Sequence, residues 1–180
     1  QEIRFTVGAG ASLEWLPQET ILYDGSLAGM RNMVRLEQGA HYLGWEILCF
    51  GRSGAGERMT RGHCRVSLQL ESEGMPRFVE RADLEAGSPA FSSPAGLAGQ
   101  SVTGTLLAAS PACDKALLDA CREHIPRLGQ GAVTLLPGVL VARYLGDSSE
   151  SAKHYFMQLR RLIRPVIMGC EANDLRIWST

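Results

Sequence analysis

Three carboxylates fall close together near the start of this chain. Glu14, Glu19 and Asp24 lie within residues 8–25, and His41 follows further on. Carboxylate and imidazole groups bind divalent transition metals, and a few of them spaced along a wet channel would suffice for transient contacts with an ion. Glu14, Glu19, Asp24 and His41 are therefore the candidate metal ligands. The competing interpretation, which the cost of burying a charge favours, is that Glu14 and Glu19 pair with backbone groups or arginines.

A glycine-rich stretch, Gly51-Arg-Ser-Gly-Ala-Gly56, has the glycine spacing of a phosphate-binding loop. The next two residues are Glu57 and Arg58, where such a loop needs Lys followed by Ser or Thr. A carboxylate at this point would repel the phosphates of a nucleotide, and no hydroxyl group is left for Mg²⁺. The stretch therefore predicts an ordinary glycine-rich turn.

The same stretch places Ser53 in a partial match to the Gly-x-Ser-x-Gly turn of many hydrolases. In that turn the serine lies between a strand and a helix. Here Ala55 replaces the final glycine, and the following residues do not have a helical pattern. A small β-rich hydrolase that uses Ser53 is an alternative function that depends on this partial match.

The cysteines of the chain do not form a recognisable framework. Their number is odd, their spacings are scattered, and no Cys-x-x-Cys occurs. This pattern favours free thiols in a reducing cytoplasm over the disulfides of a secreted protein. Cys121 and His124 lie three residues apart on an expected helix, but Cys121 belongs to its apolar face. A buried structural thiol is therefore preferred to a metal ligand.

The charge balance excludes two classes of partner. The chain has 18 Lys and Arg against 19 Asp and Glu, for a net charge of −1. A general binder of nucleic acids or of anionic membranes would show a basic excess, so neither is expected as a partner. No run of about eighteen apolar residues predicts a membrane-spanning helix. The 20 glycines favour many turns and a β-rich fold.

The first part of the chain, to about residue 109, is predicted to be mainly β. In residues 65–71, for example, Val66, Leu68 and Leu70 share one face and polar residues share the other. The expected strands cover residues 2–7, 20–23, 32–37, 41–50, 64–71, 77–81 and 101–108, followed by a pair at 132–136 and 139–144. The stretch 87–100 is rich in Gly, Ser and Pro and predicts a loop.

Two helices are expected in the C-terminal half. The first spans about residues 114–125 and is closed by Pro126. The second begins at a Ser148 or Ser149 cap, and Pro165 should end or kink it near residue 164. Its apolar residues form one arc, which consists of Ala152, Tyr155, Phe156, Leu159, Leu162, Ile163 and Val166.

Cations gather on the opposite side of this second helix. Lys153, Arg160 and Arg164 fall together there, and a charged outer face of this kind is most often simply solvated. The alternative is a surface that contacts a protein. The candidate partner-binding residues are Arg160, Arg164, Arg176 and Trp178. Trp178 lies near a terminus and is expected to be buried rather than to act as an exposed anchor.

Three blocks of the chain are similar to one known family. The first is Leu13-Glu-Trp-Leu-Pro-Gln-Glu-Thr20 with Tyr23-Asp-Gly25, and the second is Gly51-Arg, Gly56-Glu and Gly62. The third runs from Leu140-Val-Ala-Arg-Tyr-Leu-Gly146 through Arg164-Pro165 to Arg176-Ile-Trp178. In order and spacing these blocks resemble the UreD (UreH) family of urease accessory proteins. Cys170 and Leu175 depart from the family pattern, in which a basic residue and a proline are usual.

The resemblance implies a mainly β fold with stacked sheets in a solenoid-like arrangement and two α-helices in the C-terminal half. It also implies that residues 1–180 form a single domain, which corresponds to roughly the C-terminal two-thirds of a UreD-like protein. The chain begins with Gln1, and from residue 2 apolar and polar residues alternate as in a β-strand. This start agrees with a missing N-terminal section. Loss of that section would leave open strand edges.

The resemblance further implies a cytoplasmic, non-enzymatic scaffold in urease maturation. Such a protein binds apo-urease and UreF, which recruits the GTPase UreG, and the assembly inserts nickel into the urease active site. An internal channel for nickel is associated with the family. No catalytic residue and no stably bound cofactor are expected, only transient Ni²⁺. A β-rich protein-interaction module without a metal role is a further alternative.

Overall fold

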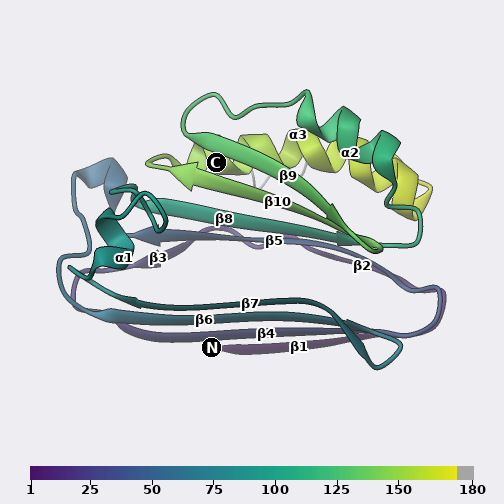
Figure 1. Cartoon of the computed structure of the whole chain (residues 1–180), viewed down its shortest axis with the longest axis horizontal. Helices are drawn as coiled ribbons and strands as arrows, with labels where there is room; N and C mark the ends of the chain where they lie inside the picture. Colours follow the sequence, from purple (N-terminus) through teal and green to yellow (C-terminus); the bar gives the residue numbers. More distant parts are fainter. Residues whose placement is uncertain (174–180) are drawn as a thin grey trace.

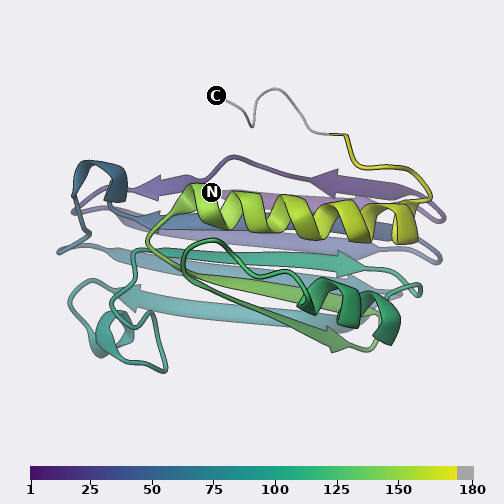
Figure 2. The ribbon, with the colours of Figure 1, turned by 90° about the horizontal axis from the view of Figure 1, so that it is seen from above.

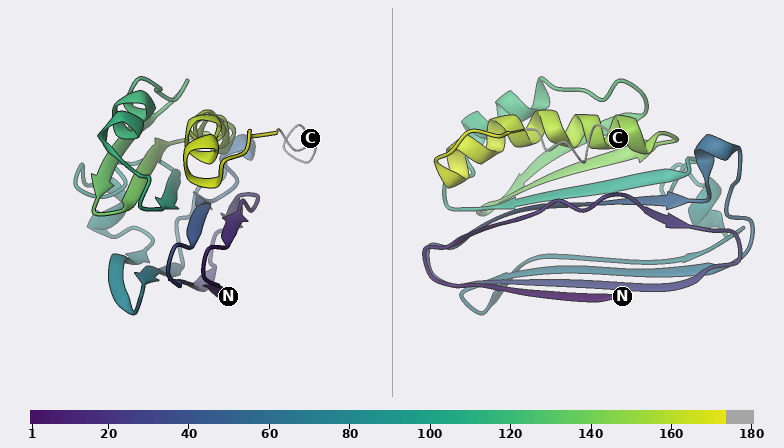
Figure 3. Two further views of the ribbon diagram at one scale, coloured as in Figure 1. Left: turned by 90° about the vertical axis from the view of Figure 1, so that its right-hand side faces the viewer. Right: turned by 180° about the vertical axis from the view of Figure 1, so that it is seen from behind.

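The computed structural model describes residues 1–173. Its elements form three layers, in which two β-sheets face each other and the two longer helices cover the outer side of one sheet (Figure 1). The end-on view in Figure 3 shows the same layers. The prediction of a mainly β chain with stacked sheets is confirmed.

Sheet A has four strands in the order β1-β4-β6-β7. They are β1 (Glu2–Val7), β4 (Leu27–Leu36), β6 (His63–Ser72) and β7 (Met75–Glu85). Sheet B has six strands in the order β2-β5-β8-β10-β9, and β3 also pairs with β5. They are β2 (Ser12–Trp15), β3 (Thr20–Leu22), β5 (His41–Phe50), β8 (Val102–Ala109), β9 (Gln130–Leu136) and β10 (Val139–Gly146).

The first half of the chain passes back and forth between the sheets. β1 belongs to sheet A, β2 and β3 to sheet B, β4 to sheet A, β5 to sheet B and β6 to sheet A. The strands brought together in this way are parallel neighbours. Every pairing that involves β7, β8, β9 or β10 is antiparallel. The expected solenoid-like arrangement is therefore not found within residues 1–173, because the early alternation between the sheets gives way to antiparallel neighbours after β6.

Most strands lie where the sequence predicts them, and β5 has the predicted bounds. The exception is β2, which was not expected. It is only four residues long, and its side chains from Leu13 to Trp15 are half-buried rather than alternately buried and exposed. It exists because it pairs in parallel with the start of β5, where Glu14 lies opposite Leu43.

The two expected helices are α2 (Lys115–Arg122) and α3 (Ser149–Met168). A short third helix, α1 (Pro89–Ser92), lies in the stretch that was predicted to be a loop, and a 3₁₀ turn, η1 (Ser53–Ala55), follows β5. Figure 2 shows α3 running along sheet B with α2 beside it. No helix within residues 1–173 combines the length and apolar character needed to cross a membrane.

The prediction that Pro165 ends or kinks α3 near residue 164 is wrong about the end of the helix. The helix continues to Met168 and closes at Gly169, whose φ of 66° is left-handed and whose N–H donates to the carbonyl oxygen of Pro165. Proline removes one hydrogen bond from the helix. The last turn buries Ile167 in the same core as Ile163, and this burial outweighs the local cost.

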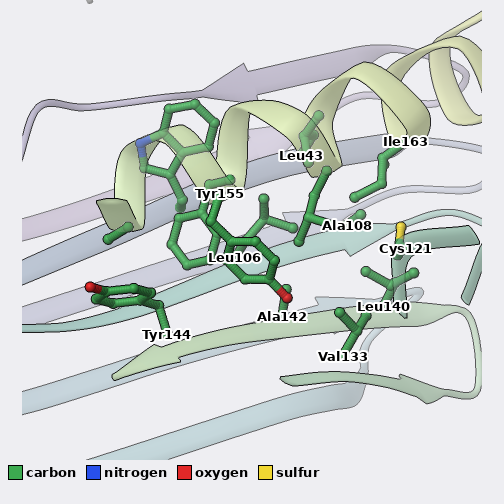
Figure 4. Close-up of a cluster of buried hydrophobic side chains, with 14 of the residues drawn as sticks. Leu43, Leu106, Ala108, Cys121, Val133, Leu140, Ala142, Tyr144, Tyr155 and Ile163 are labelled. Atoms are coloured by element: carbon green, nitrogen blue, oxygen red, sulfur yellow. The ribbon is translucent and has the colours of Figure 1, made fainter. Parts of the chain in front are cut away.

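The largest apolar core lies between sheet B and the two helices. Figure 4 shows part of it, with Leu43, Leu106, Leu140, Tyr155 and Ile163 among the labelled side chains. Gly104 on β8 lets α3 approach closely, since a methyl group there would lie 2.8 Å from the ring of Phe156. Close packing of this kind fixes α3 on the sheet.

The space between the two sheets holds two separate apolar clusters. One includes Val34, Leu36, Tyr42, Leu68, Leu70, Leu107 and Val141. The other includes Leu22, Met30, Leu48, Phe50, Met59 and Cys64. Polar side chains lie between these clusters, near the middle of the strands, and they form the candidate site.

Candidate functional site

Five polar side chains cross the space between the sheets and form what we call the polar belt: Asn32, Glu46, Glu80, Thr105 and Arg143. Asn32 on β4 and Glu80 on β7 lie opposite the same residue of β6, Leu68. Glu46 on β5 and Arg143 on β10 likewise lie opposite Thr105 on β8. The belt therefore joins one transverse row of sheet A to one transverse row of sheet B.

The members of the belt bond to one another across the gap. Asn32 Nδ2 donates to Glu46 Oε1 at 2.5 Å, and Thr105 Oγ1 donates to Glu80 Oε2 at 3.3 Å. Arg143 Nη1 donates to Thr105 Oγ1 at 3.0 Å and forms an ion pair with Glu80. Buried polar groups are costly unless they are bonded, so these contacts offset the cost of placing the belt in the interior.

Two cavities border the belt. One, of about 340 Å³, is lined by Glu46, Glu80, Thr105 and Arg143 and reaches the loop after α1. The other holds only about 10 Å³, room for roughly one water, and is lined by Asn32, Glu46 and Thr105. Glu46 and Thr105 line both cavities and so lie where the two meet. Arg143 is 43% exposed and Glu80 25%, so the belt has one buried end and one end that solvent reaches.

The electrostatics of the belt centre on Glu46. Burial raises the pKa of this carboxyl, the hydrogen bond from Asn32 lowers it, and the nearby charge of Glu80 raises it again, with a net upward shift. At the other end, Arg143 compensates the charge of Glu80. An uncompensated carboxylate at Glu46 would therefore be stabilised by any cation that reached it.

The belt offers oxygen atoms suited to weak contacts with a divalent cation. Asn32 Oδ1 is buried and has no hydrogen-bond partner within residues 1–173, so its lone pairs remain available. Carboxylate and amide oxygens bind such ions, but no group of three or more His, Cys, Asp or Glu within residues 1–173 could hold a metal. The arrangement fits brief contacts along a route better than storage.

The first of the sequence-predicted ligands, Glu14, binds cations of its own chain. Its carboxylate pairs with Arg160 and Arg164 of α3, each at 2.8 Å. Burial opposes ionisation of Glu14, but the hydrogen bonds from Arg160 and Arg164 outweigh it, so its pKa lies below the usual range. These ion pairs agree with the interpretation that Glu14 pairs with arginines, and a metal contact at Glu14 stays a prediction.

Glu19 has a similar environment. Its Oε2 lies 2.9 Å from Nζ of Lys153, which also donates to Gln18 Oε1 at 2.6 Å. Burial raises the pKa of Glu19, but the hydrogen bond and charge of Lys153 give a net downward shift. A cation from solvent would have to compete with Lys153 for this carboxylate.

The other two predicted ligands serve local structure. Asp24 Oδ1 accepts hydrogen bonds from the backbone N–H groups of Thr60 and Arg61, at 2.6 and 2.9 Å. His41 Nδ1 lies 2.9 Å from Ser110 Oγ. Neither residue belongs to the polar belt, and a metal role for either stays a prediction.

The cationic face of α3 is not a freely solvated surface, contrary to the favoured interpretation. Arg160 and Arg164 pair with Glu14 on β2, and Lys153 pairs with Glu19 just before β3. The Arg160 side chain is only 5% exposed. A direct contact of Arg160 or Arg164 with a partner protein stays a prediction. The other two partner-binding candidates, Arg176 and Trp178, lie outside the described residues.

The hydrolase alternative gains no support from the backbone around Ser53. The 3₁₀ turn η1 leads through an irregular stretch into β6 rather than into a helix. The strand-to-helix geometry of a nucleophilic serine turn is thus not formed in this described segment.

The sequence pattern did not lead to the polar belt, although a signal was present. Asn32, for example, occupies an inward position between the buried residues Met30 and Val34. A polar side chain in the inward register of an alternating strand is unusual and points to an internal polar contact. Finding its partners requires the pairing of the strands, which single-sequence patterns do not give.

Comparison with known proteins gives one consistent result. A family model described as "UreD urease accessory protein" matches residues 1–179. The chain is 47% identical over 184 residues to "Urease accessory protein UreD" of Dechloromonas aromatica, with 100% of this chain and 64% of that protein covered. It is 46% identical to the protein of the same description from Azoarcus sp., with 98% of this chain and 62% of that protein covered. The chain thus spans somewhat less than two thirds of the length of these relatives.

Proposed function

The chain belongs to the UreD family of urease accessory proteins, and on that premise we propose that it acts as a non-enzymatic scaffold in the maturation of urease. In this role it binds apo-urease and UreF in the cytoplasm. UreF recruits the GTPase UreG, and the assembly inserts nickel into the urease active site with the help of GTP. Nickel is the cargo of this process and is held only transiently.

The observation that supports a direct part in nickel handling is the polar belt. It brings two carboxylates, Glu46 and Glu80, and the unbonded oxygen of Asn32 into an otherwise apolar interior. Arg143 compensates one of the two charges. A cation that passes the belt would meet one carboxylate at a time and would be released easily, which suits transfer.

The test is a reconstituted activation assay. Apo-urease, UreF, UreG, Ni²⁺, bicarbonate and GTP are combined with and without this protein, and urease activity and nickel content are measured. We expect activation to require the protein. Activation that is unchanged when the protein is omitted would refute the role in maturation.

A pair of matched variants tests the belt itself. Glu46→Gln keeps the shape of the side chain and removes its charge, and we expect nickel incorporation to fall on the order of tenfold. Glu71→Gln is the control, since Glu71 lies on β6 beside Arg35 and outside the belt. Both variants should form the same complex on size exclusion. Normal nickel loading with Glu46→Gln would favour a protein-interaction module without a metal role.

A further inference from the structure

The connection between α2 and β9 presents two large apolar side chains to solvent. Ile125 is 81% exposed and Leu128 is 65% exposed. The connection runs beside the first turns of α3 (Figure 2). Single exposed apolar residues are normal on a protein surface, but a side chain of this size gains free energy when another surface covers it.

The exposure of Leu128 follows from its backbone, which is fixed to α3. Ser151 is buried, and its Oγ accepts a hydrogen bond from Leu128 N at 2.9 Å and donates one to Leu128 O at 2.8 Å. Because both backbone groups of Leu128 are held, its side chain stays in one outward position. A side chain that is already fixed loses little entropy when a partner binds.

A cavity of about 400 Å³ opens beside Leu128. Its walls include Leu128 and Met157, and Met157 is half-buried at the margin of the main core. A space of this size admits an apolar side chain of another protein. The strongest contacts of protein interfaces are formed in this way, where an anchor from one protein fills a pocket of the other.

The cavity is lined by two cationic side chains, Arg127 and Lys153, and by one carboxylate, Glu150. Lys153 is already paired with Glu19 at 2.9 Å. Arg127 is exposed and has no ion pair within residues 1–173. Its guanidinium group therefore keeps its donors for a carboxylate of another molecule, with which it can form two parallel hydrogen bonds.

His154 also lines the cavity and shows the sign of the electrostatic potential there. Burial lowers its pKa first, and the charges of Arg127 and Arg161 lower it further. The opposite effect of Glu150 is the smallest of these. The potential is therefore positive, and it favours a partner that carries carboxylates. A symmetric pair of copies of this chain would instead bring like charges together.

We infer that residues 125–128 and the first turns of α3 form a docking site for an acidic, amphipathic segment of a partner protein. An apolar side chain of that segment enters the cavity beside Leu128 and Met157, and its carboxylates face Arg127. This inference rests on the scaffold role proposed above and gives that role a contact surface within the described residues.

Two substitutions test the site, with purified apo-urease and purified UreF as the probes. Leu128→Ser removes the apolar wall and Arg127→Glu reverses the charge, and both side chains are exposed, so the fold should be retained. We expect both variants to weaken binding to the same partner on the order of tenfold or more. The loss in Arg127→Glu should shrink as salt is raised, because salt screens exposed charges. Unchanged affinity for both partners in both variants overturns the inference.

Met75→Ser and Arg81→Glu on β7 are the matched controls. Met75 is 61% exposed, close to the value for Leu128, and Arg81→Glu makes the same change in net charge as Arg127→Glu. Both positions belong to sheet A, whereas α3 covers the outer side of sheet B (Figure 1). We expect both controls to bind like the unaltered protein. Equal losses in the controls would mean that any change of the surface weakens binding, and they would overturn the site.

Hydrogen exchange locates the contact without any substitution. Exchange of the backbone N–H groups in residues 123–130 should slow when the partner is bound, while exchange in β7 should not change. Unchanged exchange at residues 123–130 in a complex that has formed overturns the inference. A dimer of this chain that Leu128→Ser abolishes would show that a second copy occupies the site, and it would overturn the inference as well.

None of these measurements requires nickel, GTP or urease activity. The docking site can therefore fail while the activation assay supports the scaffold role. Conversely, weakened binding in Leu128→Ser and Arg127→Glu would stand even if the activation assay refuted that role.

Discussion

The indole Nε1 of Trp45 donates a hydrogen bond to the carbonyl oxygen of Pro17 at 2.9 Å. Trp45 lies on the central strand β5 and is 2% exposed, and Pro17 lies in the irregular stretch between β2 and β3. This bond ties the stretch that separates the two edge strands to the core.

We expect Trp45→Phe to lower the free energy of unfolding by about 2–4 kcal/mol, because it leaves the Pro17 carbonyl without its donor and opens a small cavity. Urea unfolding checks this. Trp15→Phe is the control, since the indole N–H of Trp15 has no hydrogen-bond partner within residues 1–173 and so loses no bond. An equal loss in the two variants would contradict a structural role for the Trp45 bond.

Gly104→Ala tests the close approach of α3 to sheet B. The added methyl group would lie 2.8 Å from the ring of Phe156, which is fully buried and has no room to move. We expect a loss of about 1–3 kcal/mol in unfolding free energy, the usual cost of overpacking. Gly29→Ala, on β4, meets no atom within 4 Å and should be nearly neutral. A neutral Gly104→Ala would show that α3 is not pressed against β8.

Asp24 should make stability depend on pH in the acid range. Backbone hydrogen bonds, first from Arg61 and then from Thr60, lower its pKa from 3.8 to about 2. A carboxyl whose folded pKa is lowered stabilises the protein above its unfolded pKa, and this contribution is lost as pH falls through the folded value. The difference in Tm between the unaltered protein and Asp24→Ala should therefore be full near neutral pH and shrink as pH falls from 3.8 to about 2. If the difference in Tm between the two proteins instead stays constant as the pH falls to about 2, Asp24 does not stabilise the folded protein through its lowered pKa.

Glu46→Gln should have opposite effects on stability and on function. The folded pKa of Glu46 is raised, chiefly by burial, so ionisation destabilises the folded protein as pH rises above the ordinary value of 4.5. Glutamine can still accept the hydrogen bond from Asn32 but carries no charge. We expect the variant to be as stable as the unaltered protein at low pH and more stable near neutral pH, while nickel loading falls. Thermal unfolding across this pH range measures the first effect.

The strands could be predicted where burial leaves a clear local pattern. β5 is an apolar run buried against both the helices and sheet A, and its predicted bounds hold. The strand expected at 20–23 is different: Ile21 is 41% exposed, because β3 lies at the edge of sheet B and only Leu22 turns inward. A local pattern does not reveal whether a strand is central or at an edge.

The candidate site could be predicted only in part, because its contacts join distant residues. Pairing of Glu14 with backbone groups or arginines was the favoured interpretation, but its partner Arg160 lies 146 residues further along the chain and could not be named. For the same reason the cations of α3 looked solvated, since their carboxylates belong to another part of the fold. Pro165 is a third example. Proline usually ends a helix, but here α3 continues past it because the last turn buries Ile167.

The passage of the first strands between the two sheets has a consequence for how the protein forms. β1 can pair only after β4 has been synthesised, and β2 only after β5, so each waits while strands of the other sheet are made. Contacts between segments distant in sequence slow folding, and strands that wait for their neighbours are exposed to wrong partners. The emerging chain should therefore need protection while its first strands wait, and sheet B cannot be completed before β10 has left the ribosome.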